Sequence, residues 1–273
     1  MLESRRSGIN LFQRELISTL ATVEWMSGHP RVFDVDDAVW LSSRRRQTDA
    51  IAAQCELVIC GNAFLAEHYG ALSRNVVIVP TAVDISCYPT LSRGVREECV
   101  IGWSGTSGGF KYLLMIQNAL ATVLRVIPNA RVRVMADRAP DLPLLPADRV
   151  DFVRWSPERE APTIAGFDIG IMPLENTEWE RGKCSYKMLQ YMAAQVPVVV
   201  SPVGMNVEVL SEGPVGVAAT TEREWVDALI GLIADRAAAE GMGRAGRVVI
   251  ERRYSKELVG RAVISALDTI RPH

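Results

Sequence analysis

The chain has 273 residues, of which 48% are hydrophobic and 23% are charged. These values are typical of one large or two modest globular domains and exclude a disordered chain. The formal net charge of −2 gives no overall attraction to nucleic acid or to an anionic membrane. Any phosphate binding must therefore depend on local geometry, and we expect no nucleic-acid partner.

The cysteines indicate a reducing environment. Several lie in apolar runs, and none has a Cys-x-x-Cys spacing, so we expect free thiols and no zinc site. The five are Cys55, Cys60, Cys87, Cys99 and Cys184. No apolar run approaches the roughly 18 residues that a membrane span needs, and the N-terminus MLESRRSGIN lacks the core of a signal peptide. We expect a cytoplasmic protein, with peripheral membrane association left open.

The first 95 residues predict part of an α/β domain. Their pattern indicates a long helix over 8–27, a second helix from Asn62 and about three strand-like runs. The runs are RVFDV (31–35), ELVIC (56–60) and NVVIVP (75–80). A complete Rossmann-like domain usually has about five or six strands, so we expect only the trailing part of one here.

From residue 99 onward, short apolar runs alternate with helical stretches. The predicted strands are CVIGW (99–103), RVRVMA (131–136), VDFV (150–153), DIGIM (168–172) and PVVVS (197–201). Apolar strands separated by helices imply a parallel sheet covered on both faces. Ligands of such sheets bind at the carboxyl ends of the strands.

The segment between the last two of these strands carries the clearest chemical signal. A helix is predicted to begin near Lys183, which would place Lys183, Lys187 and Gln190 on one face. A lysine at a helix N-terminus is unfavourable by roughly 0.3–1 kcal/mol unless an anion lies nearby, and a phosphate would satisfy both lysines. The alternative is a solvated surface patch in which Glu178 and Glu180 neutralise them.

The sequence FDIGIMPL, followed by GKCSYKMLQYMAAQVPVVVSPVG, resembles the donor-binding region of retaining glycosyltransferases of the family-4, or group 1, type. The resemblance implies the GT-B fold, which consists of two Rossmann-like domains, and a role in polysaccharide biosynthesis. It is similar to the subgroup whose Glu-x7-Glu helix is replaced by a G-K-x-x-x-K-x-L-Q-Y-M-A helix. That spacing falls here on Gly182 and Gln190, and the Gln190 amide can still hydrogen-bond a ribose hydroxyl.

The resemblance and the residue types together predict three groups of donor contacts. The loop 104–109 has glycines that can turn N–H groups toward a diphosphate, although it also suits an ordinary tight turn. The turn at Gly204 and the early Glu208 could equally serve helix capping, and Trp155 could equally serve packing. The predicted contacts are Gly105, Thr106, Ser107, Lys183 and Lys187 for the diphosphate; Gln190, Arg154 and Trp155 for ribose and base; and Gly182, Gly204 and Glu208 on the sugar side.

Metal and acid–base chemistry are less well supported. The acidic cluster Asp34, Asp36 and Asp37 invites comparison with a DxD metal motif, but it ends a strand far upstream of the donor-like helix. We expect Asp36 or Asp37 to cap a helix or to face the interdomain cleft. The three histidines have no triad or metal-ligand spacing. The sequence thus predicts no metal, no cofactor beyond the donor substrate, and no identifiable catalytic residue.

These observations predict a GT-B-like α/β glycosyltransferase that uses a nucleotide-diphosphate sugar, a carbohydrate or lipid-linked acceptor and a retaining mechanism. The expected parts are a partial acceptor-side domain (1–95), a donor-binding domain (96–250) and a C-terminal helix (251–273) that packs back toward the first part. On the order of 100 residues of an N-terminal domain are expected to be missing, which would leave an apolar face suited to a homodimer. The main alternative is a vestigial nucleotide-sugar-binding module; a sugar-nucleotide epimerase is a weaker one.

Overall fold

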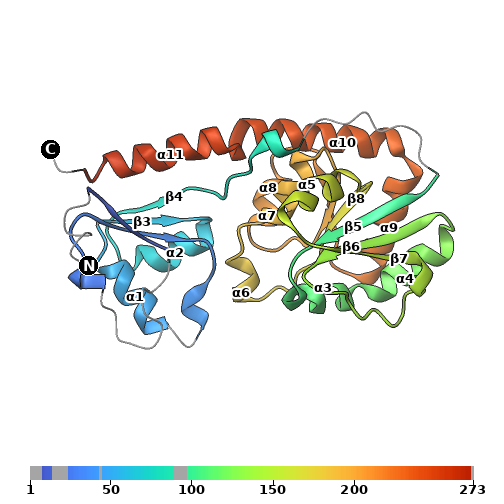
Figure 1. Ribbon diagram of the computed structural model, residues 1–273, viewed down its shortest axis with the longest axis horizontal. Coiled ribbons are helices and arrows are strands. Elements are labelled where there is room, and N and C mark those ends of the chain that lie inside the picture. The colour runs from blue at the N-terminus through green and yellow to red at the C-terminus, as the bar shows by residue number, and fades with distance from the viewer. Residues whose placement is uncertain (1–7, 14–23, 43–44, 89–96, 272–273) are drawn as a thin grey trace. The chain divides into compact units, whose positions relative to one another are not determined.

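The computed structural model describes residues 8–13, 24–42, 45–88 and 97–271 (Figure 1). Contacts divide the chain into two compact units. The N-terminal unit contains residues 1–82, 176–184 and 256–273, and the C-terminal unit contains residues 83–175 and 185–255. The first boundary thus falls at residue 82 rather than 95. Contacts group residues 176–184 with the N-terminal unit, whereas the sequence prediction placed them in the donor-binding domain (96–250).

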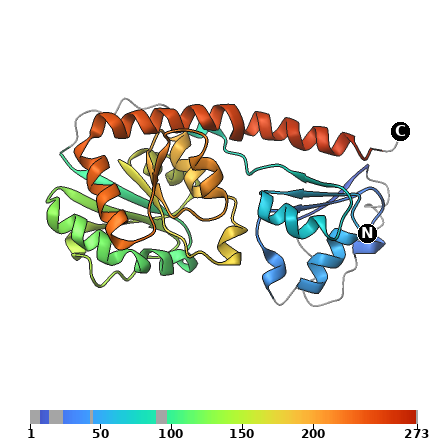
Figure 2. The same ribbon diagram turned by 180° about the vertical axis from the view of Figure 1, so that it is seen from behind.

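The N-terminal unit is built on a parallel sheet in the order β1-β2-β3-β4. Its strands are β1 (Asn10–Phe12), β2 (Arg31–Val35), β3 (Leu57–Cys60) and β4 (Val76–Ile78), and its main helices are α1 (Arg45–Ala53), α2 (Ala63–Gly70) and α11 (Lys256–Asp268). Val259 and Ala266 of α11 pack on one face of the sheet against Val32, Leu57 and Ile59 (Figures 1 and 2).

The predicted helix over 8–27 is wrong at its start. Residues 10–12 form β1, which pairs in parallel with Arg31–Phe33 of β2, and residues 14–23 lie outside the described residues. A run of three residues carries no period that would distinguish a strand from a helix. The pairing that makes it a strand comes from β2, about twenty residues later in the chain.

The C-terminal unit holds a six-stranded sheet, all parallel, in the order β10-β9-β8-β5-β6-β7. This confirms the predicted parallel α/β class. The strands are β5 (Cys99–Ser104), β6 (Ala130–Ala136), β7 (Val150–Arg154), β8 (Ile169–Met172), β9 (Val198–Val200) and β10 (Gly216–Ala218). The helices are α3 (Phe110–Met115), α4 (Gln117–Val126), α5 (Pro157–Ala165), α7 (Tyr186–Ala193), α8 (Met205–Leu210), α9 (Glu222–Ala234) and α10 (Arg236–Val249).

The two faces of this sheet are packed differently. On one face, side chains of α4 and α9, including the fully buried Trp225, form a continuous apolar core with the strands. On the other face, a methyl group built at Gly170 would lie 2.4 Å from the Tyr191 ring, and one at Gly102 would lie 2.0 Å from the Phe167 ring. Gly170 therefore lets α7 approach the sheet closely, and Gly102 leaves room for the Phe167 ring. The Tyr191 hydroxyl then accepts the Ser104 N–H at 2.9 Å, which ties α7 to the carboxyl end of β5.

The C-terminal helical region has an internal irregularity. After α10, residues Ile250–Tyr254 form one π-helical segment that stays with the C-terminal unit, and α11 begins at Lys256. The helix predicted from residue 251 is therefore two elements. Among the described residues, no helix is long and apolar enough to cross a bilayer.

Candidate donor-binding site

The carboxyl edge of the six-stranded sheet brings Lys187 to the loop after β5. A methyl group built at Gly105 would lie 2.6 Å from the Trp103 ring and 2.7 Å from Cε of Lys187. The lysine stem therefore passes directly over the glycine backbone. Its ammonium lies 5.9 Å from the centre of the Trp103 ring. The structure thus unites two of the predicted diphosphate residues, Gly105 and Lys187.

Helix α7 begins at Tyr186, not near Lys183 as the sequence predicted. Ser185 has left-handed backbone angles, φ 53° and ψ 22°, which interrupt any helix through it. Its hydroxyl donates to Oδ1 of Asn206 at 2.7 Å, and the Asn206 amide donates to the Ser201 carbonyl at 2.9 Å. Ser185 makes no side-chain cap bond to α7. The first turn of α7 therefore contains one of the two lysines, Lys187.

Lys183 lies in the segment that belongs to the N-terminal unit. Its ammonium is 4.0 Å from a carboxylate oxygen of Asp37 and 5.4 Å from the centre of the Trp179 ring. The prediction that Lys183 and Lys187 share one helix face is therefore wrong, because Lys183 precedes α7 and belongs to the other unit. The contact of Lys183 with a diphosphate stays a prediction.

The glycine loop 104–109 is partly closed by the protein's own carboxylate. Ser107 donates its N–H to Asp137 at 2.6 Å and its hydroxyl to the same carboxylate at 2.8 Å. These two hydrogen bonds hold the pKa of Asp137 below its usual value. Gly105 donates its N–H to the Met135 carbonyl at 3.0 Å, and Thr106 precedes a 3-10 turn over Ser107–Gly109. The loop turns the Ser107 N–H toward the Asp137 carboxylate, and its contact with a diphosphate stays a prediction.

The residues predicted for ribose and base lie in the C-terminal unit. Gln190 is only 2% exposed, and its amide donates to the Tyr88 hydroxyl at 3.0 Å. The enclosure of this pair raises the pKa of Tyr88. Arg154 ends β7 and is exposed, while Trp155 is 46% exposed and donates its indole N–H to Glu160 at 2.9 Å.

The three residues predicted to contact the donor sugar lie in different units: Gly204 and Glu208 in the C-terminal unit and Gly182 in the N-terminal unit. Gly204 has φ 54° and ψ −133°, a conformation that favours glycine, and it leads into α8, whose exposed Glu208 lies in the first turn. Gly182 lies in the N-terminal unit, where a methyl group would come within 2.5 Å of Cβ of Ala38. Gly182 is thus required by packing, and its predicted donor contact remains untested.

Sequence reasoning missed the polar residues that hold this edge together. Asn206 is fully buried and, through Ser185 and Ser201, connects α7, α8 and the end of β9. The Ser201 hydroxyl in turn accepts the Leu174 N–H at 3.0 Å. The local sequence signal was an asparagine two residues after the turn at Gly204. Such a signal does not reveal that the partner of this asparagine is Ser185, 21 residues earlier.

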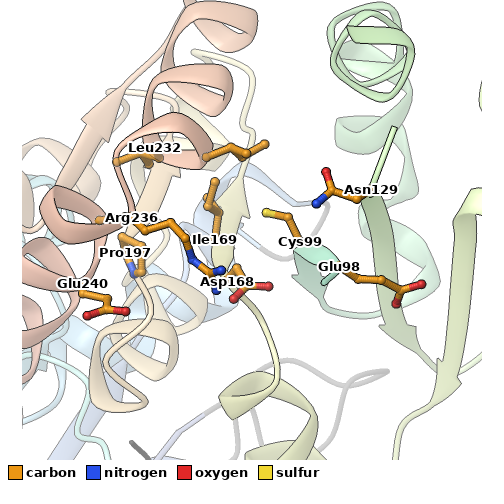
Figure 3. A pocket seen from close by; sticks show the side chains of 11 residues that line it. Glu98, Cys99, Asn129, Asp168, Ile169, Pro197, Leu232, Arg236 and Glu240 are labelled. Atoms are coloured by element: carbon orange, nitrogen blue, oxygen red, sulfur yellow. The ribbon is translucent and has the colours of Figure 1, made fainter. Parts of the chain in front are cut away.

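A cavity of about 90 Å³ lies at the opposite, amino edge of the same sheet (Figure 3). Figure 3 shows Arg236 pointing toward Asp168, whose carboxylate also accepts the Val100 N–H at 2.8 Å. Burial, with a smaller effect of Asp168, raises the pKa of the Cys99 thiol to about 12, so this thiol stays protonated. Since ligands of parallel sheets bind at the carboxyl edge, this cavity is distinct from the candidate donor site.

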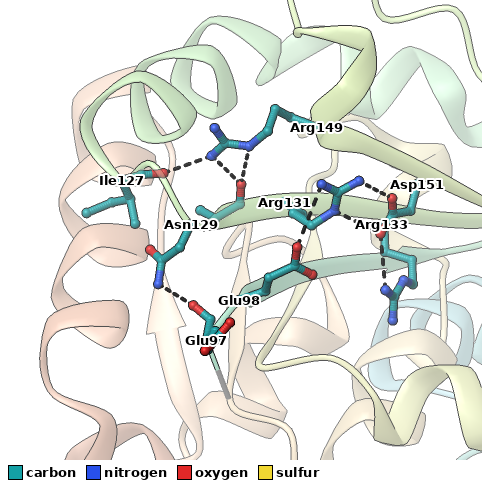
Figure 4. A network of polar contacts seen from close by, with 9 residues as sticks. Glu97, Glu98, Ile127, Asn129, Arg131, Arg133, Arg149 and Asp151 are labelled. Carbon is teal, nitrogen blue, oxygen red and sulfur yellow. Dashed lines mark hydrogen bonds and ion pairs between the residues drawn. The ribbon is translucent and has the colours of Figure 1, made fainter. Parts of the chain in front are cut away.

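Charged residues also brace the outer strands β6 and β7 (Figure 4). Asp151 accepts hydrogen bonds from Arg131 at 2.6 Å and from Arg133 at 3.1 Å, which keep its pKa low. Arg149 donates to the carbonyls of Ile127 and Ala130. These contacts fix the register of the outer strands, from which Arg154 and Trp155 continue to the carboxyl edge.

The sequence model of the family described as glycosyl transferases group 1 matches residues 98–235, which is 138 of the 273 residues. The chain belongs to this family. The match spans β5 to α9 and therefore includes the glycine loop, α7 and the Gly204 turn. No curated protein sequence matches the chain.

Several solved structures share the fold of this chain. HepE from Anabaena, in complex with UDP and glucose, has a TM-score of 0.75 at 15% identity over 90% of this chain and 73% of its own. Sucrose-phosphate synthase from Thermosynechococcus elongatus has a TM-score of 0.68 at 14% identity, over 90% and 69%. WaaG, a glycosyltransferase involved in lipopolysaccharide biosynthesis, has a TM-score of 0.65 at 11% identity, over 93% and 73%. This likeness confirms the predicted GT-B fold.

Proposed function

We propose that this group 1 glycosyltransferase binds a nucleotide-diphosphate sugar at the carboxyl edge of its six-stranded sheet. It transfers the sugar to a carbohydrate or lipid-linked acceptor with retention of anomeric configuration. The observation that carries the proposal is the position of Lys187, in the first turn of α7 and directly over Gly105. The UDP in the HepE complex supports a uridine nucleotide as the first probe.

The chemistry follows from where charge develops. As the bond between sugar and diphosphate breaks, negative charge builds on the leaving diphosphate. The N-terminus of α7 carries positive partial charge, and Lys187 adds a full positive charge beside it. Both stabilise the leaving group more in the transition state than in the ground state. In the retaining mechanism proposed here, the departing phosphate oxygen takes the proton of the acceptor hydroxyl, so no protein base is needed.

Two of the predicted contacts require a local exchange of partners. For Ser107 to donate its N–H to a phosphate, Asp137 must release it. For Gln190 to hold a ribose hydroxyl, its amide must exchange the Tyr88 hydroxyl for the ribose. Lys187 lies directly over Gly105 in the first turn of α7, and we therefore assign it the larger share of donor affinity.

The test is calorimetric titration of the full chain with UDP, comparing Lys187→Ala with Arg223→Ala. Arg223 is a cation of the same unit, 92% exposed, and pairs with Asp227 on the surface of α9. We expect Lys187→Ala to weaken UDP binding at least about tenfold, or 1.4 kcal/mol, and Arg223→Ala to change it less than about twofold. Equal affinities of the two variants would remove the diphosphate assignment.

Turnover distinguishes the enzyme from its main alternative. The alternative is a nucleotide-sugar-binding module that does not transfer. Hydrolysis of a bound UDP-sugar, with NMR detection of an anomer of unchanged configuration, would support the retaining transferase. Binding without hydrolysis or transfer to any carbohydrate acceptor would support the module.

A further inference from the structure

Two exposed aromatic rings lie at the carboxyl edge of the six-stranded sheet, where the nucleoside of the donor is predicted to bind. Trp155 directly follows β7 and is 46% exposed, and Tyr186 is the first residue of α7 and is 45% exposed. Helix α5, which begins two residues after Trp155, packs beside α7 within the C-terminal unit (Figure 1). Both rings are therefore accessible to a flat ligand bound at this edge.

The carboxylate of Glu160, in the first turn of α5, lies near both rings. Its Oε1 atom accepts the indole N–H of Trp155 at 2.9 Å. Burial, and after it the negative charge of Glu160, raises the pKa of Tyr186. The same two causes raise the pKa of Tyr88, whose hydroxyl accepts the Gln190 amide. A carboxylate in a first turn is favourable for any helix, but the helix alone does not require the bond to the indole. Glu160 thus lies among the residues predicted for ribose and base.

The separation from the predicted diphosphate site suits a nucleoside. The sheet order runs β5-β6-β7. Neighbouring strands lie about 4.8 Å apart, so the carboxyl ends of β5 and β7 are about 10 Å apart. Gly105, with Lys187 over it, follows β5, and Trp155 follows β7. A ribose between these two strand ends would bring the base to Trp155 and Glu160.

A carboxylate distinguishes bases by the hydrogen bonds that it can accept. When ionised it has only acceptor sites. Guanine presents two adjacent donors on its Watson–Crick edge, N1–H and the 2-amino group, and these match the two oxygens of a carboxylate. Uracil presents one N–H between two carbonyl oxygens, so a carboxylate that accepts this N–H brings its second oxygen against a carbonyl. A site built to hydrogen-bond one group strongly rejects an analogue that lacks it.

We infer that Glu160 accepts hydrogen bonds from the base of the donor and selects a guanosine-diphosphate sugar over a uridine-diphosphate sugar. The inference rests on the proposed function, because it places the diphosphate at Lys187 and Gly105. Trp155 is a positioning residue, since its indole N–H orients the carboxylate. Each carboxylate oxygen has two acceptor sites, so Oε1 can keep the indole N–H and also accept a base N–H. UDP carries the same diphosphate and remains a probe of Lys187, but it should bind more weakly than GDP.

The test is calorimetric titration of the full chain with GDP, UDP and inosine diphosphate, which differs from GDP only by the missing 2-amino group. We expect the unchanged protein to bind GDP about tenfold more tightly than UDP and about fivefold more tightly than inosine diphosphate. Glu160→Gln keeps the size of the side chain and an oxygen for the indole N–H, but its NH₂ group cannot accept a hydrogen bond. In this variant GDP and inosine diphosphate should bind equally within about twofold, with UDP affinity changed less than about twofold.

Two further variants separate a role in base recognition from a role in folding. The matched control is Glu158→Gln, because Glu158 is an exposed carboxylate in the same first turn of α5. It should keep the preference for GDP over both other nucleotides. Trp155→Phe keeps an aromatic ring but removes the indole N–H, and it should lower the ratio of GDP to inosine diphosphate affinity about two- to threefold while UDP binding stays unchanged.

The outcomes separate the inference from the proposed function. Equal affinities of the unchanged protein for GDP and UDP, or for GDP and inosine diphosphate, would overturn the inference. A GDP preference that survives in Glu160→Gln would overturn it as well. In each of these cases the effect of Lys187→Ala on UDP binding still tests the proposed function. Failure of the unchanged protein to bind any of the three nucleotides would instead refute the proposed function, and the inference with it.

Discussion

Gly105→Ala should displace Lys187 and thereby weaken nucleotide binding. The added methyl would lie 2.6 Å from the Trp103 ring and 2.7 Å from Cε of Lys187, both closer than carbon atoms normally approach. Trp103 is 2% exposed and is fixed in the core, whereas the lysine stem is flexible. Overpacking typically costs about 1–3 kcal/mol, and because the lysine can move but the Trp103 ring cannot, we expect about 2–3 kcal/mol of lost stability. The loss of its ammonium from the site should weaken UDP binding about tenfold.

The loop supplies its own matched control. In Gly108→Ala the nearest atom to the added methyl is the Thr106 hydroxyl oxygen at 3.7 Å, an ordinary contact. Gly102→Ala is the stability control, because its methyl would meet the Phe167 ring at 2.0 Å without touching Lys187. Urea unfolding and UDP calorimetry on the three variants separate folding from binding. The reasoning fails if Gly105→Ala binds UDP as tightly as Gly108→Ala does.

Two further predictions concern carboxylates of the C-terminal unit. Asp137→Asn should tighten UDP binding roughly two- to fivefold at low salt, because it removes an anion that competes for the Ser107 N–H; unchanged affinity in calorimetry would exclude that amide from the site. Asp151, whose pKa is lowered by Arg131 and Arg133, stabilises the fold above its unfolded pKa of about 4, and this stability is lost as the pH falls through its lower folded pKa. Urea midpoints should therefore show a gap between the unchanged protein and Asp151→Asn that is largest above about pH 5 and closes toward about pH 2; a gap independent of pH would contradict this.

The sequence predicted elements whose signals are local. Strands such as β3, β8 and β9 are short, nearly continuous apolar runs, which are typical of a parallel sheet covered on both faces. Asn62 was placed correctly at the start of a helix because its side chain caps α2 three residues away. The resemblance to group 1 glycosyltransferases rested on a contiguous motif, and the family match includes that motif.

The features that could not be predicted from the sequence depend on contacts between residues far apart in the chain. The left-handed Ser185, which moves the start of α7 past Lys183, is held by Asn206. Residues 176–184 group with the N-terminal unit, where Asn62, 120 residues before Gly182, donates to the Gly182 carbonyl. Neither a helix period nor a capping pattern contains this information, since both read only neighbouring residues.

These distant contacts change which groups can recognise a phosphate. The glycine loop was expected to offer free amides, but the Gly105 N–H bonds to Met135 and the Ser107 N–H to Asp137. The positive potential at the carboxyl edge must then come mainly from Lys187 and from the start of α7, where Ser185 gives no side-chain cap because its hydroxyl is bonded to Asn206. Asn206 thus engages the Ser185 hydroxyl, so this side chain does not cap α7.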